Sequence, residues 1–152
     1  MSNISNDQQL RAALNALALD QQRAIGGLFT NSVATLGRDP ELARAIAATA
    51  DRDISETERE EAFRLAKSIA TKTYTACGRD ADWLTQAEHF VAAACSAVLT
   101  PESQVDPKIN LAWKAAIQAR MAKNCLMMES DTAEIDNEAQ KQYKIAQEFT
   151  TD

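Results

Sequence analysis

Hydrophobic positions recur every three or four residues along most of this chain, which is the period of an amphipathic α-helix. Near the N-terminus the stripe begins at Leu10 and Leu14 and predicts one long helix over residues 5–36. Gly26 and Gly27 lie inside this stripe. Two adjacent glycines cost a helix about 2 kcal/mol of propensity, so we expect a bend or a break there.

Helix-start signals divide the rest of the chain into five more helical segments. Asp39-Pro40 and Asp106-Pro107 each place an N-capping acid before a proline at the first helical position. Ser55 and Glu58 have the spacing of a capping box. The predicted helices cover about residues 40–50, 55–78, 82–100, 107–128 and 131–149. The pattern predicts an all-α fold, a single-domain helical bundle of about six helices over residues 1–152.

The largest hydrophobic side chains are expected inside this bundle. Trp83 and Trp113 begin the fourth and fifth stripes, so we expect them to be the main packing anchors. Met121, Met127 and Met128 follow at helical spacing and are expected to fill the core.

The composition agrees with a helical fold and excludes several classes of protein. The chain has 29 alanines but only 4 glycines and 3 prolines, which is unlike a strand-rich sandwich or barrel. It has no glycine-rich phosphate loop, which excludes the common nucleotide-binding α/β folds. It also has no apolar stretch of membrane-spanning length and no secretory signal, so we predict a cytoplasmic protein without a membrane span.

The charge balance narrows the choice of partners. Sixteen basic residues against 22 acidic ones give a formal net charge of −6. This balance opposes binding to nucleic acid, which needs clustered lysine and arginine, and suits a cationic ligand or a basic protein partner. The acidic excess is concentrated around residues 51–61 and 129–138.

These two acidic stretches belong to a repeated pattern. Residues 51–66 and 131–146 each contain an acidic turn, an acid seven positions later, and then an aromatic-basic-aliphatic-alanine run. A pair of equivalent helical units would produce such a match. We therefore predict a pseudo-repeat of two acidic helix-start units, near residues 39–77 and 107–149, with their two acidic turns close together.

The repeated turn resembles the D-G-x-φ-x-x-x-E motif of TerB-like proteins, the tellurite-resistance superfamily of acidic all-helical domains. The matching residues are Asp51, Ile54 and Glu58 in the first copy, and Asp131, Ile135 and Glu138 in the second. Arg52 and Thr132 replace the glycines of the motif, and Ile135 is shifted by one position. The resemblance implies a non-enzymatic accessory protein of bacterial stress or tellurite resistance that binds a cation or a protein partner.

The acids of the two turns are candidate ligands for a weakly bound divalent cation. Carboxylate oxygens suit Ca²⁺ or Mg²⁺. An EF-hand is excluded, because Glu56 stands where that loop needs glycine and Ala62 stands where it needs a bidentate acid. Helix capping without any ligand is the alternative that we favour. The candidate metal-binding residues are Asp51, Asp53, Glu58, Asp131, Glu134 and Glu138.

Catalytic groups are scarce. His89 is the sole histidine, which excludes a metal centre that needs two histidines. A serine or cysteine nucleophile could use only His89 as its general base. Cys77, Cys95 and Cys125 fit no zinc or disulfide spacing and are interpreted as reduced core residues. We therefore expect no enzyme and no certain cofactor. The alternative to a TerB-like function is an acidic immunity or phage-type inhibitor protein that binds a basic protein partner, and homo-oligomerisation stays open.

Overall fold

The structure is a computed structural model that describes residues 3–76, 83–130 and 137–151. Of these residues 80% are helical and none lies in a strand, so the predicted all-α bundle is confirmed. Seven α-helices are present in the described ranges, where about six were predicted. Their bounds are α1 Asp7–Asn15, α2 Leu19–Asn31, α3 Pro40–Ala50, α4 Glu56–Ala76, α5 Trp83–Leu99, α6 Leu111–Ser130 and α7 Glu138–Thr150. Two short 3₁₀ helices, η1 Ala34–Leu36 and η2 Glu102–Gln104, lie between them.

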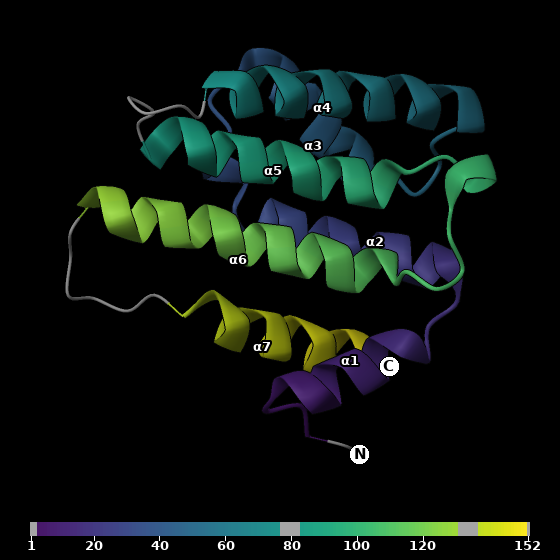
Figure 1. Cartoon of the computed structure of the whole chain (residues 1–152). Helices are drawn as coiled ribbons and strands as arrows, with labels where there is room; N and C mark the ends of the chain where they lie inside the picture. The colour runs from purple at the N-terminus through teal and green to yellow at the C-terminus, as the bar shows by residue number, and fades with distance from the viewer. Residues whose placement is uncertain (1–2, 77–82, 131–136, 152) are drawn as a thin grey trace.

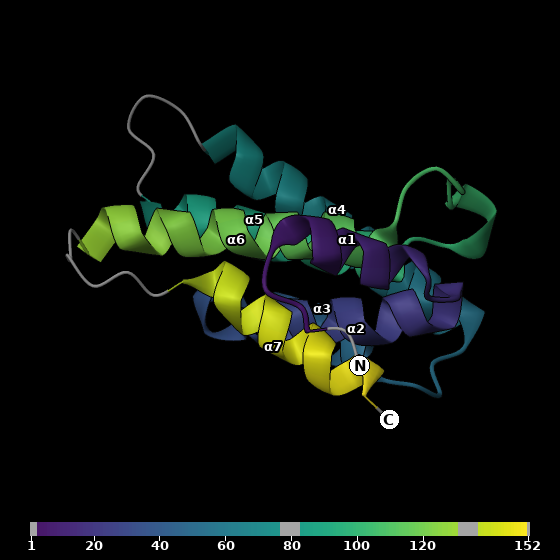
Figure 2. The ribbon, with the colours of Figure 1, turned by 90° about the horizontal axis from the view of Figure 1, so that it is seen from below.

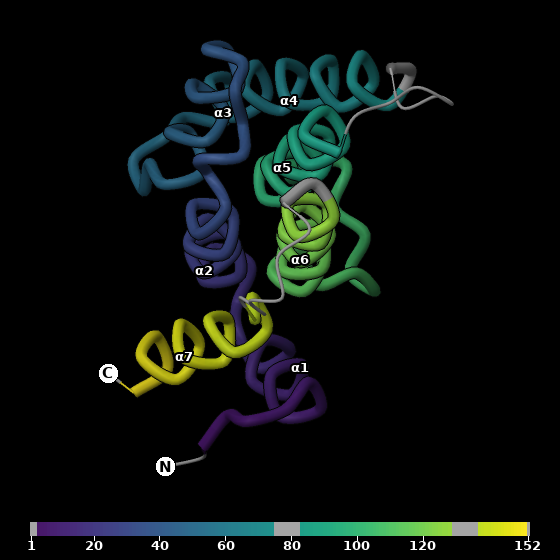
Figure 3. Tube along the Cα trace, turned by 90° about the vertical axis from the view of Figure 1, so that its left-hand side faces the viewer, coloured from purple at the N-terminus to yellow at the C-terminus, as the bar shows by residue number. Residues whose placement is uncertain are grey.

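The helices form a stack with three layers. In Figures 1 and 3, α2, α5 and α6 lie in the middle, α3 and α4 cover one side, and α1 and α7 cover the other. Figure 2 shows α1 lying over α6 and running roughly along it, with α7 beside α1. Both ends of the chain therefore lie at the α1–α7 side of the stack, far from α3 and α4 (Figure 3).

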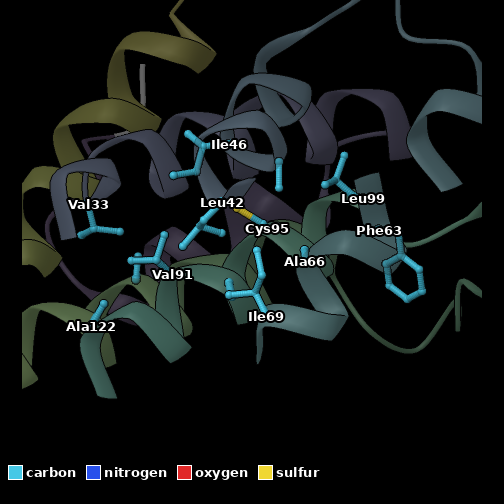
Figure 4. Close-up of a cluster of buried hydrophobic side chains, with 13 residues drawn as sticks. Val33, Leu42, Ile46, Phe63, Ala66, Ile69, Val91, Cys95, Leu99 and Ala122 are labelled. Atoms are coloured by element: carbon cyan, nitrogen blue, oxygen red, sulfur yellow. The ribbon is translucent and has the colours of Figure 1, made fainter. Parts of the chain in front are cut away.

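Two large hydrophobic clusters fill the spaces between these layers. The first is built from η1, α3, α4, α5 and α6, and its members include Leu42, Phe63 and Val91 (Figure 4). The second is built from α1, α2, α6 and α7, and its members include Leu14 and Phe29. Helix α6 contributes alanines to both clusters, so it ties the two halves of the stack together.

Alanine, rather than tryptophan or methionine, makes the buried face of α6. Most of that face consists of Ala112, Ala115, Ala116, Ala119 and Ala122, with Leu111 and Cys125 buried toward its two ends. Small side chains let α5 and α6 pack closely along this face. The predicted core roles of Met121 and Met128 are therefore wrong, since they are 41% and 59% exposed. Trp83 is 37% exposed, and Trp113 is half-buried against the second cluster.

The expected single helix over residues 5–36 is in fact two helices, and the break lies ahead of the glycines. Helix α1 ends at Asn15 and α2 begins at Leu19, whereas Gly26 and Gly27 sit inside an unbroken α2. A Cβ atom on Gly27 would lie 2.5 Å from the Thr49 carbonyl oxygen of α3. This glycine therefore permits a close contact between α2 and α3 and does not bend the helix.

None of the helices in the described ranges has the length and apolar character that would let it cross a membrane.

Candidate functional site

The first acidic turn joins α3 to α4, and its acids hold the turn together. Asp51 ends α3, and its Oδ1 accepts a hydrogen bond of 2.9 Å from the Asp53 amide. Ser55 Oγ accepts from the Glu58 amide at 3.1 Å, while Glu58 Oε1 accepts from the Ser55 amide at 3.3 Å. The predicted capping box at Ser55 and Glu58 is confirmed. These acids therefore have structural roles before any ligand is considered.

Glu56 fixes the start of α4 against the segment that follows α5. Its Oε1 accepts a hydrogen bond of 3.1 Å from the Glu102 amide, and its Oε2 pairs with the Arg59 guanidinium. The hydrogen bond from Glu102, with Arg59 contributing, holds the pKa of Glu56 below its ordinary value. This carboxylate therefore stays charged, and it ties the acidic turn to η2.

Arg23 of α2 binds the C-terminal end of α5, just before the η2 segment that contacts Glu56. Its guanidinium is buried and donates to the carbonyl oxygens of Val98 at 2.6 Å and Thr100 at 2.7 Å. Burial, and then the nearby charge of Arg59, lower the pKa of Arg23. These bonds satisfy carbonyl groups at the C-terminal end of α5, which would otherwise lack helical partners.

Two of the predicted site residues, Asp51 and Glu58, line a groove between α3 and α4. The groove has a volume of about 280 Å³, and Glu61 adds a third carboxylate to its wall. Arg44 is the single cation among its lining residues. We call this groove the acidic groove. Its apolar lining is Ala47, Ala48, Ile54, Ala62 and Leu65.

The lining of the acidic groove differs from the predicted set of acids at Asp53 and Glu61. Asp53 was a candidate ligand, but it is exposed and does not line the acidic groove. Glu61 was not chosen, although it lies three residues after Glu58 and therefore on the same face of α4. The helical spacing of these two acids was the signal that could have identified Glu61.

The second acidic turn is not brought to the first in the part of the chain that the structure describes. Asp131 and Glu134 lie outside the described residues. Glu138 is the first residue of α7, next to the N-capping Asn137. In Figure 1, α4 begins at the end of the stack where η2 lies, whereas α7 begins at the opposite end, after α6. The expectation that both turns lie together is therefore wrong for Glu58 and Glu138.

Glu138 is also chemically unlike its sequence counterpart Glu58. It is only 4% exposed, and its Oε2 accepts a hydrogen bond of 2.6 Å from Oγ of Ser32, the residue that follows α2. Its Oε1 has no hydrogen-bond partner and lies 4.0 Å from the Lys141 ammonium nitrogen. Glu138 therefore anchors α7 to α2, and does not face an open surface as Glu58 does.

Metal-binding geometry is absent from the described ranges. No group of three or more histidine, cysteine, aspartate or glutamate side chains is placed there so that it could hold a metal ion. Asp51 and Glu58 share one groove, but together with Glu61 they form a charged wall and not a coordination shell.

The candidate catalytic side chains are packed. His89 Nδ1 lies 2.8 Å from the Ala70 carbonyl oxygen, and its ring contacts the rings of Tyr74 and Phe90. Burial raises the pKa of the Cys95 thiol to about 12, so it is not an activated nucleophile. Cys125 is buried as predicted, and Cys77 lies outside the described residues.

Comparison with known proteins gives no relative: no protein-family model, no curated protein and no solved structure matches the chain. The resemblance to TerB-like proteins therefore stays a prediction that rests on the residues of the two acidic turns.

Proposed function

We propose that this protein is a non-enzymatic helical binding protein, and that its acidic groove takes a basic segment of a protein partner. The observation that carries the proposal is the lining of that groove. Asp51, Glu58 and Glu61 stand on its wall around an apolar floor, with one arginine among them. Charged groups around an apolar patch favour a partner of opposite charge and give the contact its specificity.

The acidic groove suits a peptide segment better than a free ion. Its volume of about 280 Å³ is far larger than one cation needs, and about half of its lining residues are apolar. An aliphatic side chain on the floor and lysine or arginine groups at the wall would use both parts of this surface. A divalent cation has less support, because the carboxylates in the described ranges do not converge on a point.

Both biological hypotheses use the same surface. A TerB-like accessory protein of stress or tellurite resistance and an acidic immunity or inhibitor protein would each bind a basic partner through these carboxylates. The neighbouring genes would distinguish them, since a tellurite-resistance cluster favours the first and an adjacent toxin gene favours the second.

A charge-reversal experiment tests the proposal. The probe is a twelve-residue peptide in which lysines flank two leucines spaced four residues apart, here called the Lys/Leu peptide. Glu61→Lys should weaken its binding about tenfold in titration calorimetry, because the substitution reverses one wall charge of the acidic groove. Glu148→Lys is the matched control, because Glu148 is exposed on α7 and makes the same change in net charge far from the groove. Equal affinity of the two variants would contradict the proposal.

A further inference from the structure

A second groove lies between the end of α1 and the start of α6, at the other side of the stack from the acidic groove (Figure 3). Its volume is about 400 Å³. We call it the basic groove. Its lining residues are Arg11, Asn15, Lys108, Ile109, Asn110, Trp113, Lys114, Ile117 and Gln118.

The charge of this groove is opposite to that of the whole chain. Arg11, Lys108 and Lys114 line it, and none of its lining residues, all of which the structure describes, is acidic. Asp106 lies nearby, but its Oδ1 accepts a hydrogen bond of 2.9 Å from the Lys108 amide. In a protein of net charge −6, three cations around one groove form a local positive field that attracts anionic groups.

The apolar part of the basic groove is partly exposed, although the guanidinium groups of Arg11 and Arg120 both lie against the Trp113 ring. Ile109 is 43% exposed, and Trp113 is half-buried, with the Arg11 guanidinium carbon 5.0 Å from its ring centroid. Tryptophan and arginine are the residue types that most often dominate the binding energy of protein interfaces. An aliphatic side chain placed between Ile109 and Trp113 would remove apolar surface from water.

The floor of the groove is held in place by Asn110, which caps α6. Its side-chain nitrogen donates to the Leu14 carbonyl oxygen at 2.9 Å and to Asn15 Oδ1 at 3.1 Å. Its Oδ1 accepts from the Trp113 amide at 3.0 Å. The Asn110 side chain therefore joins α1 to α6 and fixes the backbone of Trp113, so little conformational entropy is lost there when a ligand binds.

We propose that the basic groove binds an acidic segment of a partner protein. An aliphatic side chain of that segment packs against Trp113 and Ile109. The carboxylates of the segment pair with Arg11, Lys108 and Lys114. Charge complementarity favours an acidic partner, because all the charged residues that line the basic groove are basic. The proposal is independent of the acidic groove. If both hold, the protein has two binding surfaces of opposite charge on opposite sides of the stack.

The fluorescence of Trp113 provides the test. In a Trp83→Phe background, the tryptophan emission excited at wavelengths that tyrosine does not absorb comes from Trp113 alone, since the chain has two tryptophans. The probe is a twelve-residue peptide in which glutamates flank two leucines spaced four residues apart, here called the Glu/Leu peptide. It should shift the Trp113 emission in a saturable way at low salt, and added salt should weaken its binding. The Lys/Leu peptide should leave the emission unchanged.

Two double variants with equal net charge show whether the lysines of the basic groove are responsible for binding the Glu/Leu peptide. Lys108→Glu/Lys114→Glu should weaken the binding of the Glu/Leu peptide at least about tenfold. Lys67→Glu/Lys144→Glu reverses two exposed lysines on α4 and α7 and should leave it within about twofold. Ile109→Ser should weaken binding without changing the charge.

Four outcomes would overturn the proposal. They are no emission change with the Glu/Leu peptide, an equal change with the Lys/Leu peptide, equal affinity of the two double variants, and a Trp113 shift that depends on protein concentration without peptide. The last outcome, with dimers in analytical ultracentrifugation, would assign the groove to a second copy of this chain.

Discussion

At the scale of single residues, Arg23 shows how one buried cation supports the acidic turn. Its guanidinium donates to the carbonyl oxygens of Val98 and Thr100, at the end of α5. The chain then continues to η2, where the Glu102 amide holds Glu56 at the start of α4. The position of the acidic turn therefore depends on a charged residue of α2 that is distant in the sequence.

Replacement of Arg23 by methionine should destabilise the protein by about 3 kcal/mol, because two hydrogen bonds from a charged donor are lost and two carbonyl groups are left without them. Urea unfolding would measure this loss. Arg44→Met is a matched control on an exposed residue of α3 and should change stability by less than about 0.5 kcal/mol. A loss below about 1 kcal/mol for Arg23→Met would show that water replaces the guanidinium.

Asp7 makes the ionic contact that closes α1 onto α6 and α7. Its carboxylate accepts from both terminal nitrogens of Arg120, at 3.0 and 2.8 Å, and from the Tyr143 hydroxyl at 2.8 Å. The hydrogen bonds from Arg120, with the Tyr143 contact, hold the pKa of Asp7 below its ordinary value of 3.8, while burial opposes them. Burial, and then the Asp7 contact, raise the pKa of Tyr143.

A lowered carboxyl pKa stabilises the folded state above the ordinary pKa of the group, and this stabilisation disappears as the pH falls through the folded-state value. Asp7→Asn should therefore lower the free energy of unfolding at pH 7, and the difference from the unsubstituted protein should shrink as the pH falls below about 4. The effect should be modest, because the Asp7 side chain is 49% exposed. Urea unfolding at pH 7 and pH 3 tests this, and a difference that does not change with pH would contradict it.

At the scale of elements, the contact between α2 and α3 depends on the absence of one side chain. Gly27→Ala adds a Cβ atom 2.5 Å from the Thr49 carbonyl oxygen, so the two helices must move apart. We expect a net loss of about 1–3 kcal/mol even though alanine has the higher helix propensity. Thermal unfolding followed by circular dichroism measures it.

Leu28→Ala is the control for this prediction, because Leu28 is adjacent to Gly27 but 45% exposed. It should cost less than about 1 kcal/mol. An increase in stability for Gly27→Ala would mean that helix propensity matters more there than the contact with Thr49.

The starts of α3 and α4 were predictable from the sequence, because capping is local chemistry. Asp39 accepts from the Glu41 amide, and Ser55 forms the expected box with Glu58. The predicted helix start at Asp106-Pro107 is wrong, since α6 begins at Leu111 and is capped by Asn110. The helix faces were less predictable, because a face is decided by its partner. An alanine-rich contact between α5 and α6 placed Met121 and Met128 outside, although their spacing fits a buried stripe. The break before Leu19 had no glycine or proline to mark it.

At the scale of the whole molecule, the charges are arranged as two separated grooves. The acidic groove lies with α3 and α4 at one side of the stack, and the basic groove lies with α1 and the start of α6 at the other (Figure 3). The net charge of −6 gives no sign of the basic groove. Each groove combines charges with an accessible apolar floor, which is the usual make-up of a protein interface.

The sequence predicted one of these grooves in part. Asp51, Glu58 and Glu61 belong to one acidic stretch, so their proximity follows from helical spacing and a short turn. Arg11 and Lys108 are almost a hundred residues apart, and only the packing of α1 on α6 brings them together. A single sequence carries no signal for such a pair, which is why the basic groove was not predicted.

The proposal that the acidic groove binds a basic segment is tested most directly by NMR, which maps the binding of the Lys/Leu peptide onto the backbone amides. We predict chemical-shift changes that cluster at the acidic groove, in residues 44–48, 51–54 and 58–65, with a much smaller response in α1 and α6. Glu61→Lys should remove most of these changes, and Glu148→Lys should preserve them. Shift changes spread over all helices, or confined to the α1–α6 face, would contradict the claim that the acidic groove is the binding surface.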